Sequence, residues 1–215
     1  MLTELFTNPF SFLVWFLALL VAITVHEFSH AAAADRLGDP TPRLAGRLTL
    51  NPFAHLDPLG TLMLLLVRFG WGKPVPIDPF NLKNPRRDAA LISLAGPASN
   101  LILAMVLSFL IRFPFFPFIG LVGYLFIEVL KPIIVLSVIL AIFNLLPIHP
   151  LDGFKIVAGF LRDDLVNQWE ELAGLGPFFL LFLILPFFGG SIIGNIISPI
   201  ISFILRILLP GPSLI

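Results

Sequence analysis

The sequence predicts an all-α membrane protein, a polytopic helical bundle of five to six transmembrane helices with short re-entrant or surface segments. The first observation is the composition: 58% of the 215 residues are hydrophobic, 12% are charged, and the mean hydropathy is +1.00. Soluble domains are far less apolar. The second observation is a set of apolar runs that approach or exceed the roughly 20 residues a helix needs to cross a bilayer. These runs cover residues 10–26, 89–111, 132–147 and 178–205.

The first helix is expected to run from Pro9 to Leu37 and to end at Gly38. The polar, proline-rich residues 38–52 that follow cannot stay in hydrocarbon, because their backbone groups need water or protein partners. Residues 58–69 are apolar but too few to span, which indicates a short dipping helix before a second surface loop at residues 70–87.

The next full span is expected over Asp88 to Arg112, and the chain then turns through "RFPFFPF". Glu128 and Lys131 are three residues apart, so they can pair on one helical face near the interface. The chain then recrosses the membrane over Pro132 to Leu146.

The last part of the chain, residues 172–209, is expected to form a helical hairpin broken at Pro186, Gly189 and Gly190. We assign residues 1–215 to a single integral-membrane domain, with a core at about residues 9–160 followed by the C-terminal hairpin.

The basic residues indicate which loops face the cytoplasm, because cytoplasmic loops near spans are enriched in Lys and Arg. The loops on one side hold Arg36, Arg43, Arg47, Lys73, Lys83, Arg86, Arg87, Lys155 and Arg162, whereas the other side holds Arg112 and Lys131. We therefore expect a multi-pass protein of the cell membrane with its N-terminus outside and both polar loops in the cytoplasm.

The charge balance and the lack of cysteine exclude some classes of function and of metal ligand. Thirteen basic and thirteen acidic residues give a net charge of zero, and no run of like charge suggests a nucleic-acid partner. The chain has no cysteine, so there is no thiolate nucleophile or ligand. A bound metal would have to use His, Asp or Glu.

The motif "HEFSH" places His26, Glu27 and His30 inside an apolar stretch, where ionisable groups are costly and usually functional. Residues four apart lie on one helical face, so the two imidazoles can bind one zinc ion. Glu27 is close enough to act as a general base without being a ligand. The alternative is that the two histidines are buried polar side chains hydrogen-bonded to neighbouring helices.

A catalytic zinc site needs a third protein ligand from elsewhere. The candidates are Asp152, His55, His149, Asp57 and Glu128. We rank Asp152 first, because Pro150 and Gly153 would bend the backbone and let its carboxylate point inward. Taken alone, an aspartate at this place is more often a helix cap.

Several motifs together resemble the site-2 protease family of intramembrane zinc metalloproteases. They are "HEFSH", "NLLPIHPLDG", which follows the pattern NxxPxxPLDG, and "LAGPASN" at residues 94–100. The stretches "GRLTLNPFAHLDPLGT" and "FGWGKPVPIDP" are typical of its compact bacterial and archaeal branch, which has no PDZ or CBS domain. The sequence shows no segment that reads as either domain.

The resemblance implies His26, His30 and Asp152 as zinc ligands, and Glu27 as the catalytic base. It also implies that Asn144 and Asn100 line the site, in contact with an oxyanion or the substrate. His55 lies in a loop and is expected to line the approach.

The function predicted from these residues is an intramembrane zinc endopeptidase that cleaves transmembrane segments of other membrane proteins. Two short segments, residues 46–50 and 74–77, are expected strands that could pair with an unwound substrate. The alternative function is a zinc-binding membrane transporter or sensor without peptidase activity. An inactive scaffold is disfavoured by the intact Glu27.

Overall fold

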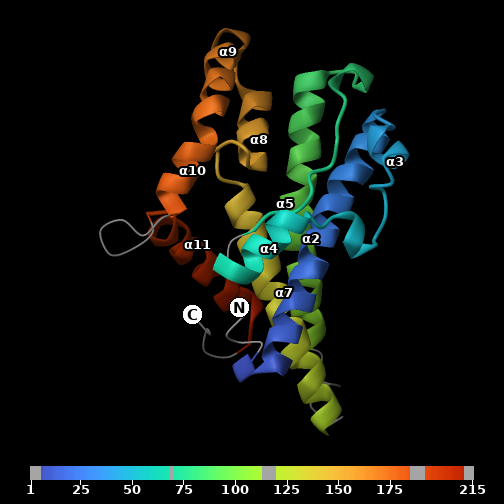
Figure 1. Ribbon diagram of the computed structural model, residues 1–215, viewed down its shortest axis with the longest axis vertical. Helices are drawn as coiled ribbons and strands as arrows, with labels where there is room; N and C mark the ends of the chain where they lie inside the picture. The colour runs from blue at the N-terminus through green and yellow to red at the C-terminus, as the bar shows by residue number, and fades with distance from the viewer. Residues whose placement is uncertain (1–5, 68–69, 113–119, 185–191, 211–215) are drawn as a thin grey trace.

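Three long helices form the centre of the computed structural model, which describes residues 6–67, 70–112, 120–184 and 192–210 (Figure 1). They are α2 (Pro9–Leu37), α5 (Pro85–Ile111) and α7 (Gly120–Asn144), and each is long and apolar enough to cross a membrane. Within the described ranges, β-structure is limited to one isolated bridge between Leu56 and Gly72. The predicted all-α class is confirmed, and the number of spans stays a prediction.

Helix α2 has the predicted bounds because both of its ends are capped. The Asn8 side chain accepts a hydrogen bond from the Ser11 N–H at 3.1 Å, and Pro9 occupies the first turn, where it loses no hydrogen bond. At the other end Gly38 adopts φ 109°, a left-handed conformation that favours glycine and stops the helix.

The two following spans are longer than expected. Helix α5 begins at Pro85, and α7 begins at Gly120 and continues through Pro132, the residue at which the crossing was expected to start. The predicted pair is present, since Lys131 Nζ lies 2.7 Å from Glu128 Oε1. The expected turn "RFPFFPF" lies largely outside the described residues.

The helices pack through small side chains and branched aliphatic ones, as membrane helices do. The main cluster joins α5, α7 and α11 (Ile192–Leu208) through residues that include Ala104, Ile134, Val138, Ile201 and Leu205. Helix α8 (Asp152–Phe160) lies so close to α5 that a Cβ on Gly159 would be 2.3 Å from that of Ala90.

The polar segments between α2 and α5 contain short helices in place of the expected strands. The short helices are α3 (Thr41–Leu44), η1 (Pro52–Ala54), α4 (Pro58–Val67) and η2 (Pro79–Asn81), and α4 agrees with the predicted dipping helix. The strand predictions for residues 46–50 and 74–77 are wrong. Prolines 74 and 76 lack the N–H groups that a ladder needs, and the Arg47 guanidinium joins the loops instead by donating to the carbonyls of Ala54 and Lys73.

The C-terminal part contains α9 (Asp163–Glu171), η3 (Leu172–Leu175), α10 (Gly176–Ile184) and then α11. Gly176 is packed against His149, beyond the end of α7, whereas Leu208 accepts a hydrogen bond from Ser108 Oγ at 2.5 Å, near the end of α5. Helices α10 and α11 are both present (Figure 1), and the helical hairpin expected over residues 172–209 stays a prediction. The break expected at Pro186, Gly189 and Gly190 lies outside the described residues.

Asp39 fastens the end of α2 to the loop before α5. Its buried carboxylate accepts hydrogen bonds from the N–H and hydroxyl of Thr41, the N–H of Asp78 and the side-chain amide of Asn81, at 2.5–3.0 Å. Burial by itself raises the pKa of Asp39, but these hydrogen bonds outweigh it and hold the pKa below its ordinary value.

Replacing Asp39 with Asn should lower the free energy of unfolding by about 1–3 kcal/mol, because the amide turns a donor toward groups that are themselves donors. The depressed pKa means that the stabilisation is complete above the unfolded pKa of about 3.9 and is lost as the pH falls through the lower folded value. Thermal unfolding of both proteins in detergent should show that the wild type is more stable than Asp39→Asn at pH 7, and that this difference in stability becomes smaller toward pH 3. An equal difference in stability at both pH values would contradict the role of the ionised Asp39 carboxylate.

Candidate metal centre

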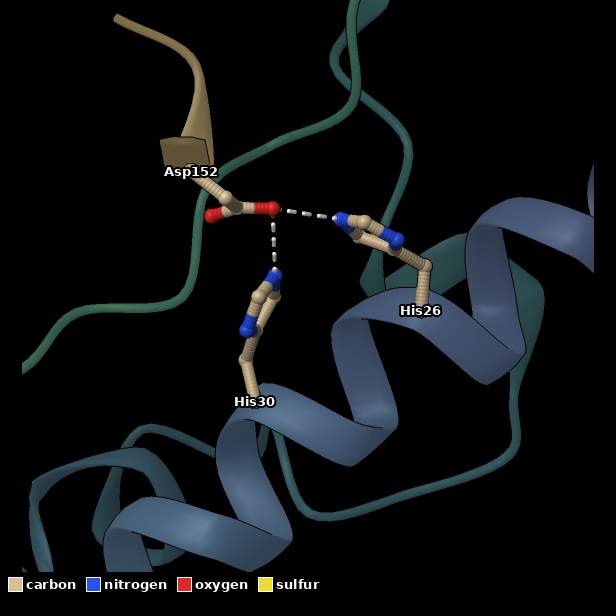
Figure 2. A group of neighbouring side chains, drawn as sticks. All are labelled: His26, His30 and Asp152. Carbon is tan, nitrogen blue, oxygen red and sulfur yellow. Dashed lines mark hydrogen bonds and ion pairs between the residues drawn. The ribbon is translucent and has the colours of Figure 1, made fainter. Parts of the chain in front are cut away.

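Three side chains from two distant helices meet at one point beside α5. His26 and His30 project from the same face of α2, and Asp152 is the first residue of α8 (Figure 2). Asp152 Oδ2 lies 3.1 Å from His26 Nε2 and 3.3 Å from His30 Nε2. Both histidines are buried and Asp152 is half-buried. These are the residues that the sequence predicted as ligands, and the structure brings them together.

The spacing of these atoms suits a single small cation. The ligand atoms of the three residues all lie within 4.8 Å of one another. Nitrogen and oxygen ligands at 2.0–2.1 Å in a tetrahedron are about 3.3 Å apart. Two imidazoles and a carboxylate therefore fit zinc and leave a fourth position for water or substrate.

The sequence around Asp152 explains how its carboxylate reaches α2. Helix α8 starts at Asp152, directly after the turn that follows α7. Gly153 faces the end of α7 so closely that a Cβ there would lie 2.3 Å from the carbonyl oxygen of Leu146. Only glycine permits this fold-back, which explains why an Asp-Gly pair stands at the site.

Helix α5 packs directly against the two imidazoles at Gly96. A Cβ on Gly96 would lie 2.4 Å from His30 Nε2 and 2.7 Å from His26 Cε1. The rings stand nearly perpendicular to each other, at 87°. The missing side chain at position 96 therefore makes the space in which both rings sit.

The second ring nitrogens of both histidines also have neighbours on α5. His30 Nδ1 lies 2.7 Å from the carbonyl oxygen of Ile92, so it donates its proton there and leaves Nε2 with a lone pair. His26 Nδ1 lies 3.4 Å from Nδ2 of Asn100. Metal-binding histidines are commonly oriented by a hydrogen bond from the ring nitrogen that does not bind the metal.

Asp152 is held in its charged form. Burial opposes ionisation, yet the contacts with His26 and His30 hold the pKa of this carboxyl well below its usual range. A deprotonated carboxylate is the form that binds a metal.

Glu27 lies close to the loop that precedes α5. A Cβ on Gly72 would be 3.5 Å from Glu27 Oε1 and 3.2 Å from the carbonyl oxygen of His55. The buried Arg47 attracts the Glu27 carboxylate electrostatically. Glu27 therefore sits next to the metal-ligand group, with Gly72 and Arg47 from the loops beside it.

The other ligand candidates have structural partners elsewhere. His55 Nε2 lies 2.8 Å from the Thr49 carbonyl oxygen, and Asp57 accepts a hydrogen bond from the Gly60 N–H. Glu128 is paired with Lys131, and His149 packs its ring edge-on against Phe154. Among the described residues, the group able to hold a metal is His26, His30 and Asp152.

The two predicted site-lining amides differ in position. Asn100 contacts His26, whereas Asn144 at the end of α7 donates to the Leu140 carbonyl oxygen at 2.9 Å. Gly96, Ile92 and Arg47 were not predicted as site residues. "AGPASN" pointed to close helix packing around Gly96, but a backbone carbonyl such as that of Ile92 carries no sequence signal.

Known proteins resemble this chain over most of its length. Residues 120–185, which include Asp152, match the model of Peptidase family M50. The chain is 37% identical over 180 residues to "Putative zinc metalloprotease YwhC" of Bacillus subtilis, a match that covers 79% of this chain and 78% of that protein.

Two mycobacterial proteins named "Putative zinc metalloprotease Rip2" are more distant. The Mycobacterium tuberculosis protein is 34% identical over 183 residues, 81% of this chain and 66% of its own length. The Mycolicibacterium smegmatis protein is 34% identical over 157 residues, 67% of this chain and 56% of its own length. No solved structure matches the chain. Together with the metal-ligand group and the long apolar helices, these similarities show that the chain belongs to peptidase family M50, the site-2 proteases, and is a multi-pass membrane zinc metalloprotease.

Proposed function

We propose that this protein is an intramembrane zinc endopeptidase that hydrolyses peptide bonds within transmembrane segments of other membrane proteins. The observation that carries the proposal is the meeting of His26, His30 and Asp152 at 3.1–3.3 Å, with Glu27 on the same turn of α2. In this proposal the first three residues hold the zinc ion and Glu27 is the catalytic base.

The chemistry divides between the metal and the chain. A bound zinc ion supplies Lewis acidity, which polarises a peptide carbonyl and lowers the pKa of water. Glu27 accepts the proton of the attacking water and returns it to the leaving amine. Asp152 and the two imidazoles keep the cation in place.

Asn144 is the proposed donor to the oxyanion that forms on the scissile carbonyl. Its amide now donates to Leu140 of the preceding helical turn, so it must exchange that bond to serve substrate. His55 braces the loop that approaches Glu27 and acts on the site only through that loop.

We place the active site at the cytoplasmic side, with the N-terminus outside. The loops between α2 and α5 carry most of the basic residues near the spans, which favours a cytoplasmic position. Hydrolysis needs water, and both polar loops reach Glu27, through Arg47 and Gly72. We therefore propose that water enters between these loops, because the hydrocarbon itself supplies none.

Replacing Glu27 with Gln should leave zinc bound and lower the cleavage rate by about 10²–10⁴-fold, because only the base is lost. Zinc content is measured by atomic absorption, and cleavage by gel shift of a panel of tagged single-span proteins. Glu128→Gln, which removes a carboxylate far from the site on α7, is the matched control and should cleave normally. Full activity in Glu27→Gln would end the assignment of the base. Liposome zinc flux that persists in this variant without cleavage in the wild type would favour a transporter.

Replacing Gly96 with Ala should lower zinc affinity at least about tenfold, because the added methyl group would overlap the ring of His30 at 2.4 Å. Affinity is measured by competition with a fluorescent zinc chelator on the purified full chain. Gly174→Ala is the control, since a Cβ at Gly174 has no neighbour within 4 Å in the described part of the chain. Unchanged affinity in Gly96→Ala would contradict the placement of α5 against the imidazoles.

A further inference from the structure

Asn100 is a fully buried amide on α5 whose only described partner is a proposed zinc ligand. Its Nδ2 lies 3.4 Å from His26 Nδ1, and its Oδ1 is buried without a hydrogen-bond partner in the described part of the structure. Buried polar atoms in membrane helices are expected to be paired. The unpaired Oδ1 therefore needs an explanation.

The two nitrogens of His26 face different neighbours, so their protons can be assigned. A neutral imidazole has one donor nitrogen and one acceptor nitrogen. Nε2 points to Asp152 and Nδ1 points to Asn100. If Nε2 gives its lone pair to a metal, Nδ1 must carry the proton, and that proton needs an acceptor.

His30 shows how the same requirement is met one turn along α2. Its Nδ1 lies 2.7 Å from the carbonyl oxygen of Ile92, which can only accept. The His26 ring also interacts with a backbone carbonyl, that of Gly96, but its Nδ1 in addition faces the side-chain amide of Asn100 at 3.4 Å. An amide offers an oxygen as well as a nitrogen, and a half-turn about its terminal bond exchanges the two with little change in shape.

We propose that Asn100 is a positioning residue whose Oδ1 accepts a hydrogen bond from the Nδ1–H of His26, and so fixes the tautomer and orientation in which Nε2 binds zinc. The proposal rests on the zinc ligation proposed above. It gives Asn100 a role through His26, in place of the direct contact with substrate expected from the sequence. It also gives the buried Oδ1 a partner.

The test compares Asn100→Asp with Asn100→Ala by zinc titration of the full-length protein in detergent. Asp has nearly the same shape as Asn and presents only acceptor oxygens to His26, whereas Ala presents none. We expect Asn100→Ala to lower zinc affinity about 10–100-fold, the range seen for such supporting contacts, and Asn100→Asp to stay within about threefold of the wild type. Ser108→Ala removes another buried polar group from α5, far from the site, and should bind zinc normally.

A spectroscopic measurement covers the case in which the buried Asp prevents folding. In zinc-loaded wild-type protein labelled with ¹⁵N-histidine, the His26 resonances should show a metal-bound Nε2 and a protonated Nδ1. In Asn100→Ala the Nδ1 proton should exchange rapidly with water.

Three results would overturn the proposal. They are unchanged affinity in Asn100→Ala, an equal loss in a folded Asn100→Asp, and a metal bound to Nδ1 of His26. Each leaves the peptidase proposal standing if the wild type binds zinc and Glu27→Gln is inactive. Failure of the wild type to bind zinc would instead overturn the proposed function itself.

Discussion

The contact of one carboxylate with two imidazoles, across 126 residues of sequence from His26 to Asp152, governs the arrangement of this protein. Ionisable groups buried among apolar helices are costly unless each polar atom has a partner. Helix α5 provides most of these partners. It leaves room for the rings at Gly96, accepts a hydrogen bond from His30 at the Ile92 carbonyl and places Asn100 beside His26.

The local features of the fold were predictable because the sequence encodes them locally. The Asn8–Pro9 start and the Gly38 end fix α2 to the residue, and the four-residue spacing of His26 and His30 fixes their common face. Pro150 and Gly153 indicated a bend that could turn the Asp152 carboxylate inward. These signals depend only on neighbours in the chain, so they could be read without knowledge of the packing.

The failures concern elements whose structure is set by distant contacts. The segment 74–77 was expected to be a strand, but its prolines and the Arg47 bonds to Ala54 and Lys73 produce an irregular loop. Pro132 was expected to begin a helix, yet the helix continues through it because that region is buried against its neighbours.

The length of α2 links the reaction centre to the lipid around it. At 1.5 Å per residue its 29 residues extend about 43 Å, more than the roughly 30 Å of bilayer hydrocarbon. A helix longer than the hydrocarbon is thick adapts to a thinner bilayer by leaning over. His26, Glu27 and His30 would lean with it as one rigid turn, while Asp152 and the Gly72 loop belong to other segments. A change in the tilt of α2 relative to α8 would therefore change the distances between the histidines and Asp152, which are 3.1 and 3.3 Å here.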